Sequence, residues 1–585
     1  MPDIWRLYSR QIPKSQALHI RTDALALKTE RLGPLPLINH FLERLDLEAR
    51  LERFVPTHDR RIRLPYAKAL GVLLRSVLVE REPLYRQHET VSTYAPQAFG
   101  LDAALLQQVG DDAEGRALDR LFDADSAALL TDVVVAAVAA FDVALKELHN
   151  DSTSVSFCGQ YPQAKGRKLR GKRAPFITHG YSKDHRPDLK QLLFVLTTSD
   201  DGGVPVQFRC EHGNTGDSCT HQQPWDALCH AAGQVNFLYV ADSKLCAREP
   251  MDHIAQRGGR FVCVMPRTRQ EDTEFREWIQ THDPQWEPVW DRPNPRRRGG
   301  PRDRWWVFRY PLPSREGWPV IWVYSALLAL RQEHRRRERI ARAIQELDDF
   351  NNKLIGPRAR KRLRREVQVR IDEILREHKV VRYLEVELTR DQEHRYQQAR
   401  RGRPGPNTRY VRKTRKFWRL NWLINEEHIA YDRKSDGMYP LLTNDPTLTN
   451  VQALEAHKRQ PTIEKCFEQT KTVFEIAPVL LKNEGRIEAL FFVYFLAMLV
   501  QALIERELRQ AMRREGIDEL HLYPEERKTQ RPTAEQILRL FSLTQRHILQ
   551  QEEVSIHTFE PELTDLQRQI LALLKVPLST YRTVI

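Results

Sequence analysis

Two aspartates lie in stretches whose other residues predict buried β-strands, where a charged side chain is unfavourable. Asp151 lies within LHNDSTSVSF (148–157), whose Leu, Val and Phe residues are typical of a buried strand. Asp242 ends the apolar stretch NFLYVAD (236–242). A buried carboxylate is costly unless a cation holds it, and two of them on neighbouring strands would repel unless they shared one. Mg²⁺ suits such a pair, because it binds one or two carboxylates and keeps positions open for phosphate oxygens.

A third carboxylate is expected from the helical segment RQPTIEKCFEQTKTVFEI (459–476). Its helical spacing predicts one buried face, formed by Ile463, Phe467 and Phe474. Glu464 lies at the edge of that face, and Lys471, two turns later, shares its side of the helix. Glu468 is the competing acidic candidate. Two divalent ions about 3.5–4 Å apart, held by three carboxylates, can activate an attacking water or hydroxyl and stabilise the leaving oxygen.

Each acid also has an ordinary explanation when it is taken alone. Aspartates that follow strands commonly form turns or helix caps, and glutamates on helices are mostly solvated. Only the combination of the three acids favours a catalytic site over those separate structural roles.

Composition restricts the kind of protein and its partners. The chain has 585 residues, of which 41% are hydrophobic, so a folded protein of several domains is expected. Lys and Arg number 92 against 78 acidic residues, a net charge of +14 that favours a polyanionic partner such as nucleic acid. Seven cysteines, an odd number, predict no disulfide framework. The most apolar run, 489–504, contains Gln501 and is short for a membrane span, so we expect a buried helix and a cytoplasmic protein.

The pattern of apolar residues changes several times along the chain. Helical spacing dominates 36–82 and 125–145, and short strand patterns alternate with a helix over 155–266. A rougher, highly charged region follows, with two basic loops and further strands. Helical spacing returns from about residue 451, and two more helices are expected near 533–550 and 561–575. The predicted class is therefore α/β, with a mixed sheet, and the chain shows no internal repeat.

Several stretches together match one family. They are NDSTSVSF (150–157), HGYSKDHRPDLKQLLFVL (179–196), VPVQFRCEHGNTGD (204–217), YVADSKLCA (239–247) and IEKCFEQTK (463–471). In this order they resemble the DDE transposases of bacterial insertion sequences, in the branch named for its Tyr-Arg-Glu-Lys signature. The resemblance covers about 150–270 and 430–510 and is most specific in GYSKDHRPDLKQ.

The resemblance implies a ribonuclease-H-like core, a mixed sheet with helices on both faces, in which Asp151, Asp242 and Glu464 are the metal ligands and the catalytic residues. The implied cofactor is Mg²⁺, for which Mn²⁺ would substitute. The implied domains are a helical N-terminal accessory or DNA-binding domain (1–124), the first part of the core (125–268), an α+β insertion (269–445), the second part of the core with the glutamate helix (446–515) and a C-terminal helical tail (516–585).

The resemblance also implies a set of DNA-binding residues, with one departure from the signature. Lys471 takes the place of the signature lysine. The signature tyrosine and arginine positions hold His457 and Gln460, and Arg459, one place away, is the candidate to replace the arginine. Glutamine lacks both the charge and the fork geometry with which arginine binds phosphate. In the GYSKD segment, Lys183 and Arg186 are further candidates for phosphate contacts, against the alternative of a charged hairpin rim.

The predicted insertion carries many tryptophans and arginines. Aromatic side chains can stack on a base flipped out of a duplex, but tryptophans that alternate along strands more simply pack a small sheet. We favour packing for most of the six, which are Trp305, Trp306, Trp318, Trp322, Trp418 and Trp422. The basic runs 296–298, 335–337 and 400–403 are expected to face solvent or the DNA backbone.

The expected activity is metal-dependent cleavage at the ends of an insertion sequence, followed by transfer of the freed strand into target DNA. The expected partners are double-stranded DNA, as terminal inverted repeats and as target, and further copies of the chain in a dimer or larger multimer on DNA. The expected location is the cytoplasm, at the nucleoid when DNA is bound, with no membrane partner. Two alternatives stay open: a nuclease of the same core without strand transfer, and a catalytically decayed DNA-binding protein, suggested by His457 and Gln460.

Overall fold

The structure is a computed structural model of the whole chain. It describes residues 25–80, 82–159, 161–183, 185–216, 221–294, 297, 299–356, 359–468, 481–523, 525, 527–551 and 554–582. The chain divides into two compact units. The first comprises Met1–Phe261 and Lys458–Ile585, and the second is Val262–His457.

The largest sheet of the chain is mixed and has nine strands, which confirms the α/β class. In the first unit its strand order is β6 (Pro205–Glu211), β5 (Lys190–Ser199), β2 (Glu147–Phe157) and β7 (Leu238–Ala241). β6, β5 and β2 are antiparallel neighbours, whereas β7 runs parallel to β2. Nearly every residue of β2 and β5 is buried or half-buried, as a central strand covered on both faces requires.

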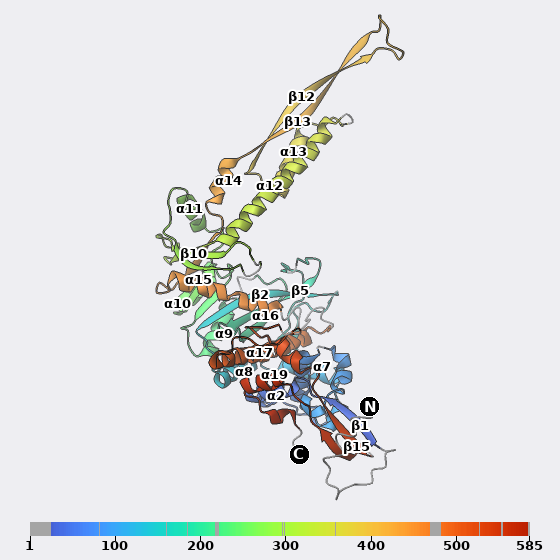
Figure 1. The fold of residues 1–585 in the computed structure, drawn as a ribbon, viewed down its shortest axis with the longest axis vertical. Helices are drawn as coiled ribbons and strands as arrows, with labels where there is room; N and C mark the ends of the chain where they lie inside the picture. The colour runs from blue at the N-terminus through green and yellow to red at the C-terminus, as the bar shows by residue number, and fades with distance from the viewer. Residues whose placement is uncertain are drawn as a thin grey trace. The chain divides into compact units, whose positions relative to one another are not determined.

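One long helix, α17 (Glu484–Glu515), packs on the sheet of the first unit (Figure 1). Phe491 of this helix lies against Phe157 of β2 and Phe194 of β5, with ring centroids 6.5 and 5.8 Å apart. The helix begins at a capping residue, Asn483, whose side chain accepts hydrogen bonds from the backbone N–H groups of Gly485 and Arg486. α17 therefore packs on the face of β2 that carries Phe157, and the alternation of side chains along the strand places Asp151 on that same face.

α17 is also the segment with the most apolar composition. By length and composition it is able to cross a membrane, but 78% of its most apolar window is buried inside the protein. Gln501, the polar residue within that window, is itself buried. The helix thus occupies the core, as the sequence predicts for 489–504.

Helices from both ends of the chain complete the first unit. The N-terminal ones are α2 (Leu35–Arg44), α3 (Leu47–Phe54), α4 (Tyr66–Val79), α5 (Gln87–Val91), α6 (Ala103–Leu106), α7 (Asp111–Asp123) and α8 (Ser126–Phe141). α9 (Gln222–Ala232) and α10 (Arg248–Gln256) flank β7 in the sequence, and α18 (Ala534–Phe541) and α19 (Asp565–Leu573) lie in the C-terminal part. A small hairpin, β3 (Lys168–Leu169) with β4 (Lys172–Arg173), is separate from the main sheet.

The C-terminal tail is not wholly helical, which corrects the expectation for 516–585 and for a helix over 533–550. α18 ends at Phe541, and β15 (Gln545–Gln551) forms a strand between β1 (Leu25–Arg31) and β16 (Val554–Phe559). β1 pairs along all seven of its residues with β15. Hydrogen bonds to a strand more than 500 residues away therefore outweigh the local preference for helix.

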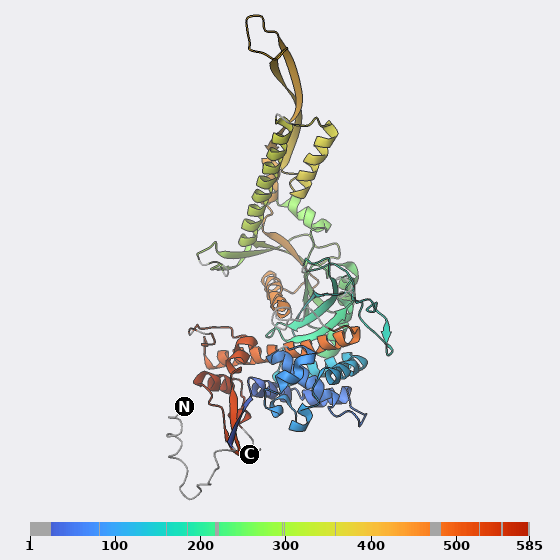
Figure 2. The same ribbon diagram turned by 90° about the vertical axis from the view of Figure 1, so that its right-hand side faces the viewer.

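The second unit contains the remaining strands of the large sheet. Their order is β8 (Arg260–Val264, which begins in the first unit), β14 (Met438–Thr443), β11 (Val320–Ser325), β10 (Asp303–Arg309) and β9 (Glu287–Arg292). The unit also holds α11 (Gln270–Trp278), α12 (Ala326–Ile355), α13 (Arg364–Glu377), α14 (Glu426–Arg433) and most of α15 (Asn450–Arg459). A separate two-stranded hairpin, β12 (Leu384–Gln398) with β13 (Tyr410–Ile424), stands on α12 and α13 (Figures 1 and 2).

Most tryptophans of the second unit take part in packing. Trp305 and Trp322 are buried, and Trp322 stacks on Phe275 with ring centroids 3.6 Å apart. Trp418 and Trp422, on β13, pack against the apolar cluster between α12 and α13. One expectation for the basic runs is wrong: Arg336 is buried and pairs with Asp436 at 2.5 Å, so it faces neither solvent nor DNA.

Candidate active site

Asp151 and Asp242 lie at the same level on two neighbouring strands of the first unit. β2 and β7 pair in parallel, with His149 opposite Val240. Two residues further along both strands, the register places Asp242, the first residue after β7, opposite Asp151. Residues that lie opposite each other in parallel strands point to the same face, so this register, continued past the end of β7, directs both carboxylates to one side of the sheet.

Glu464 comes from α16 (Pro461–Glu468), a helix that contacts β2 and β5. Ile463 and Phe467 are buried, as the sequence predicts, and Glu464 is exposed beside them. Phe474, the third residue of the predicted face, lies outside the described residues. The helix therefore rests on the sheet by its apolar side and carries the glutamate at the edge of that contact.

The charges of Asp242 and Glu464 both act on Asp151. Burial raises the pKa of Asp151 to about 6, and the charges of Asp242 and Glu464 push it in the same direction. Lys183 and a hydrogen bond from the backbone N–H of Ser152, 2.7 Å from Asp151 Oδ1, oppose that rise. Residues separated by up to 313 positions in the sequence thus act on one half-buried carboxylate.

Lys183 is turned toward this carboxylate rather than toward solvent. Its Nζ lies 3.7 Å from Asp151 Oδ1 and donates hydrogen bonds to the backbone oxygen and, at 2.8 Å, to the hydroxyl of Ser152. The backbone N–H of Lys183 donates to the Ser154 hydroxyl at 3.0 Å. β7 pairs with β2 only as far as His149, so the lysine lies along the edge of β2 that β7 leaves uncovered. This placement makes Lys183 a neighbour of the acids.

The GYSKD segment that carries Lys183 is held by close backbone packing. Gln191 of β5 donates from its side chain to the carbonyls of Tyr181, at 3.1 Å, and Gly213, at 2.9 Å. A Cβ atom on Gly180 would lie 1.9 Å from the Gly213 carbonyl oxygen and would clash with it, so only glycine fits at this position. Both glycines belong to stretches that the sequence marks as motifs, and the structure shows that they pack against each other.

The candidate site offers carboxylate oxygens as ligands, and its net charge is negative; both properties fit a divalent cation. Three carboxylates and the one ammonium of Lys183 sum to −2 when all are ionised, which one divalent ion neutralises. Within the described residues, no three His, Cys, Asp or Glu side chains are gathered closely enough to hold an ion by themselves. Mg²⁺ does not require this, because it is commonly bound by one or two carboxylates, with water and substrate phosphates supplying the other ligands.

Arg459 has a partner within the first unit. Its guanidinium forms a two-pronged ion pair with Glu147, the first residue of β2, with Nε–Oε1 and Nη2–Oε2 distances of 2.7 and 2.6 Å. His149 Nε2 hydrogen-bonds the same carboxylate at 2.8 Å. Burial works against ionisation of Glu147, but the bonds from His149 and Arg459 outweigh it and lower its pKa to about 2. Within the first unit, Arg459 is therefore tied to the strand that carries Asp151.

The other predicted DNA-binding residues are placed less favourably for phosphate. Gln460 is 8% exposed. His457, assigned to the second unit, packs its ring edge against Tyr439 there. Arg186 is exposed and pairs with Asp188 at 2.8 Å, a geometry that fits the charged hairpin rim as well as a phosphate contact. Lys471 lies outside the described residues.

Sequence reasoning missed four residues that build this site. Gln191 is a polar residue buried in a strand, Glu147 anchors Arg459, and Ser152 and Ser154 hold Lys183. The two serines carried a signal, because small hydroxyl residues at alternate positions of a strand share a face and can accept hydrogen bonds there. Glu147 carried none, since its partner is 312 residues away.

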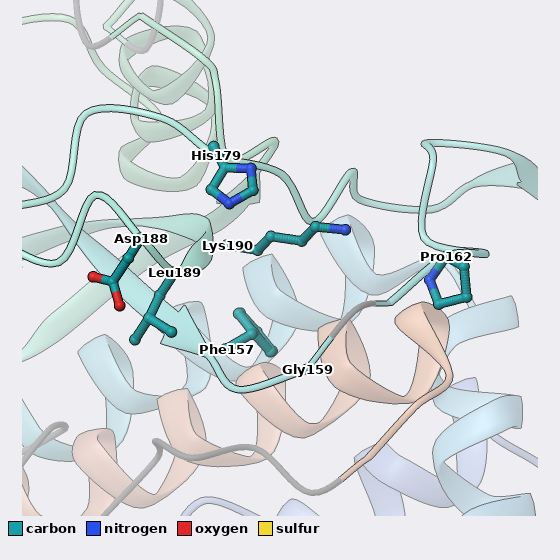
Figure 3. Close-up of a pocket in the computed structure, with 7 residues that line it drawn as sticks. All are labelled: Phe157, Gly159, Pro162, His179, Asp188, Leu189 and Lys190. Atoms are coloured by element: carbon teal, nitrogen blue, oxygen red, sulfur yellow. The ribbon is translucent and has the colours of Figure 1, made fainter.

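An open pocket of about 520 Å³ lies at the end of β2 that carries Phe157 (Figure 3). It is lined by Phe157, Gly159, Pro162, His179, Asp188, Leu189 and Lys190. Figure 3 shows the Lys190 side chain extending across it, below His179 and above Phe157. None of the three acids lines this pocket, so it is a separate hollow beside the same GYSKD segment.

Comparison with protein-family models and with curated proteins found no match to this chain. The role of the acids must therefore be inferred from their own chemistry and surroundings.

Proposed function

We propose that this chain is a metal-dependent DNA transposase of the DDE type, with a ribonuclease-H-like core in its first unit. The observation that carries the proposal is the convergence of Asp151, Asp242 and Glu464. They come from β2, from the end of β7 and from α16, and the charges of Asp242 and Glu464 both raise the pKa of the half-buried Asp151. A structural role for any one acid does not explain why three elements so distant in sequence bring their carboxylates close enough for two of the charges to act on the third.

In this proposal Asp151, Asp242 and Glu464 hold Mg²⁺, for which Mn²⁺ substitutes. When bound, the metal supplies Lewis-acid activation of the attacking oxygen and stabilisation of the leaving oxygen in phosphoryl transfer. The reaction hydrolyses a phosphodiester at each end of the element and frees a 3′-hydroxyl, which then attacks a phosphodiester of the target DNA.

The other residues of the site have positioning roles. Lys183 and the backbone N–H of Ser152 fix the orientation of the Asp151 carboxylate, and the apolar side of α16 fixes the height of Glu464 above the sheet. The two-pronged ion pair between Arg459 and Glu147 holds the chain to β2 close to the start of α16, because Arg459 lies two residues before Pro461, the first residue of that helix.

The test is Mg²⁺-dependent cleavage and joining of DNA that carries the inverted repeats flanking the gene. Asp151→Asn is expected to abolish both reactions while leaving end binding intact, because asparagine keeps the size of the side chain and removes its charge. Glu464→Gln is expected to do the same, whereas Glu468→Gln, one turn along the same exposed side of α16, serves as the matched control and should retain activity. Equal loss from the two glutamate variants would contradict the assignment of Glu464.

One observation favours a second candidate, a catalytically decayed DNA-binding protein. The signature arginine position holds the buried Gln460, and the guanidinium of Arg459 is already bound to Glu147. Under this alternative, wild type and Asp151→Asn bind the ends equally and neither cuts. Cleavage without joining would instead indicate the nuclease.

A further inference from the structure

The hairpin of β12 and β13 changes character along its length. At its base, Leu384, Leu388, Leu420, Trp418 and Trp422 pack against the apolar cluster formed by α12 and α13. Arg415 marks the end of this support, because its guanidinium donates hydrogen bonds to the last carbonyls of α12, including that of Ile355 at 3.0 Å. Strand pairing continues past that point to the pair Gln398 and Tyr410. We call residues 394–414, which lie beyond the support, the arm.

No residue of the arm is buried, and almost all are exposed. Figures 1 and 2 show from two directions that the hairpin extends past the ends of α12 and α13 within the second unit. An isolated two-stranded ribbon is only marginally stable in water. One face of the arm continues the face of the hairpin that packs at the base. On that face Tyr396, Arg412 and Tyr410 are exposed, and all three are polar or amphipathic. The arm therefore does not serve to bury apolar surface of this chain.

The charge of the arm is of one sign. It contains seven basic residues, Arg395, Arg400, Arg401, Arg403, Arg409, Arg412 and Lys413, and no acidic one, against a net +14 for the whole chain. Arg395 pairs with Glu393, just outside the arm, at 3.1 Å. The other six form no ion pair with any acidic residue in the described part of the chain. Exposed like charges at this density repel each other unless a polyanion neutralises them.

We propose that the arm binds double-stranded DNA through its phosphates, without regard to sequence. A two-stranded ribbon has the width that the major groove of B-DNA admits. The five residue pairs of the arm span about 17 Å at about 3.3 Å per residue, and that length of duplex carries roughly ten phosphate charges. Basic side chains lie on both faces of the ribbon, Arg412 on one and Arg395 with Lys413 on the other, so both walls of a groove are within reach.

This inference deepens the proposed function, since it assumes DNA as the partner, but it needs neither metal nor catalysis. Its test is equilibrium binding of the full-length protein to a random-sequence DNA duplex in EDTA, over a series of salt concentrations. The arm variant carries Arg401→Gln, Arg403→Gln, Arg409→Gln and Arg412→Gln. The matched control carries Arg331→Gln, Arg339→Gln, Arg342→Gln and Arg376→Gln, which are exposed arginines of α12 and α13 in the same unit and give the same change in charge.

The arm variant is expected to bind the duplex at least about tenfold more weakly than the control at moderate salt. The slope of log K against log salt should fall by up to about 3.6, at about 0.9 for each lost phosphate contact. Binding by the arm variant within twofold of the control would overturn the proposal. A loss confined to single-stranded DNA or to double-stranded RNA of the same length would overturn it as well.

The outcome is separable from that of the proposed function. If the wild type cleaves element ends while the arm variant keeps its affinity for random duplex, the arm inference fails and the transposase stands. If neither protein cleaves but the arm variant loses duplex binding, the arm inference stands and the catalytic proposal fails.

Discussion

Replacing Glu147 by glutamine tests how strongly the fork with Arg459 holds the active-site strand. Glutamine has the same shape and keeps one hydrogen-bond acceptor, but it mimics the protonated carboxyl and loses the ion pair. Glu147 is buried, and its carboxylate is held by Arg459 at 2.6 and 2.7 Å and by His149 at 2.8 Å. Glu147→Gln is therefore expected to destabilise the first unit at neutral pH.

The magnitude follows from the pKa of Glu147, which lies at about 2 in the folded chain against an ordinary 4.5. A lowering of this size corresponds to at most about 3.4 kcal/mol, at about 1.36 kcal/mol per pH unit. Since the Arg459 side chain is 41% exposed, solvent screening reduces the value, and we expect about 1–2 kcal/mol. Because the folded pKa is the lower one, this stability is fully present above pH 4.5 and is lost as the pH falls toward 2. The linkage relation between the two pKa values predicts that more than about half of this stabilisation is lost by pH 3.

The assay is urea unfolding of wild type and Glu147→Gln at pH 7 and at pH 3. Midpoints are compared, because a chain of two units does not unfold in a single two-state step. Glu52→Gln is the matched control, since Glu52 is exposed and has no ion pair in the described part of the chain. The gap between wild type and Glu147→Gln should narrow clearly from pH 7 to pH 3. A gap that stays constant, or one no larger than that of Glu52→Gln, would refute the reasoning.

Three further changes probe the supports of the site. Gly180→Ala would place a Cβ 1.9 Å from the Gly213 carbonyl oxygen, so it should displace Lys183, lower the melting temperature and reduce DNA cleavage. Gly216→Ala is the control: its Cβ would meet no atom within 4 Å, so it should have none of these effects. Asn483→Ala removes the cap of α17 and should lower the free energy of unfolding in urea by about 1 kcal/mol. Asn483→Asp keeps a capping oxygen and should retain most of the stability of the wild type. Phe491→Ala opens the contact with Phe157 and Phe194 and should cost about 3–5 kcal/mol, while Val135→Ala, at a 47% exposed position, should change the midpoint little.

The sequence by itself determined the elements that carry the three acids. Period-two and continuous apolar patterns predicted β2, β5 and β7, and the helical spacing of Ile463 and Phe467 predicted the buried side of α16. These predictions succeed because a strand or helix that buries one face places apolar residues at regular intervals along its own sequence. The same is true of α17, whose apolar run is long enough to indicate a core helix directly.

Only the tertiary structure decided how those elements are tied together. The fork between Arg459 and Glu147 joins residues 312 positions apart, Lys183 turns inward to Asp151, and β15 becomes a strand because β1 lies beside it. A charged side chain carries no local mark of its partner, and a segment of mixed preference takes the conformation that a distant neighbour stabilises. Composition alone likewise showed the excess of positive charge, but the position of the arm beyond its supporting helices depends on where α12 and α13 end against the hairpin.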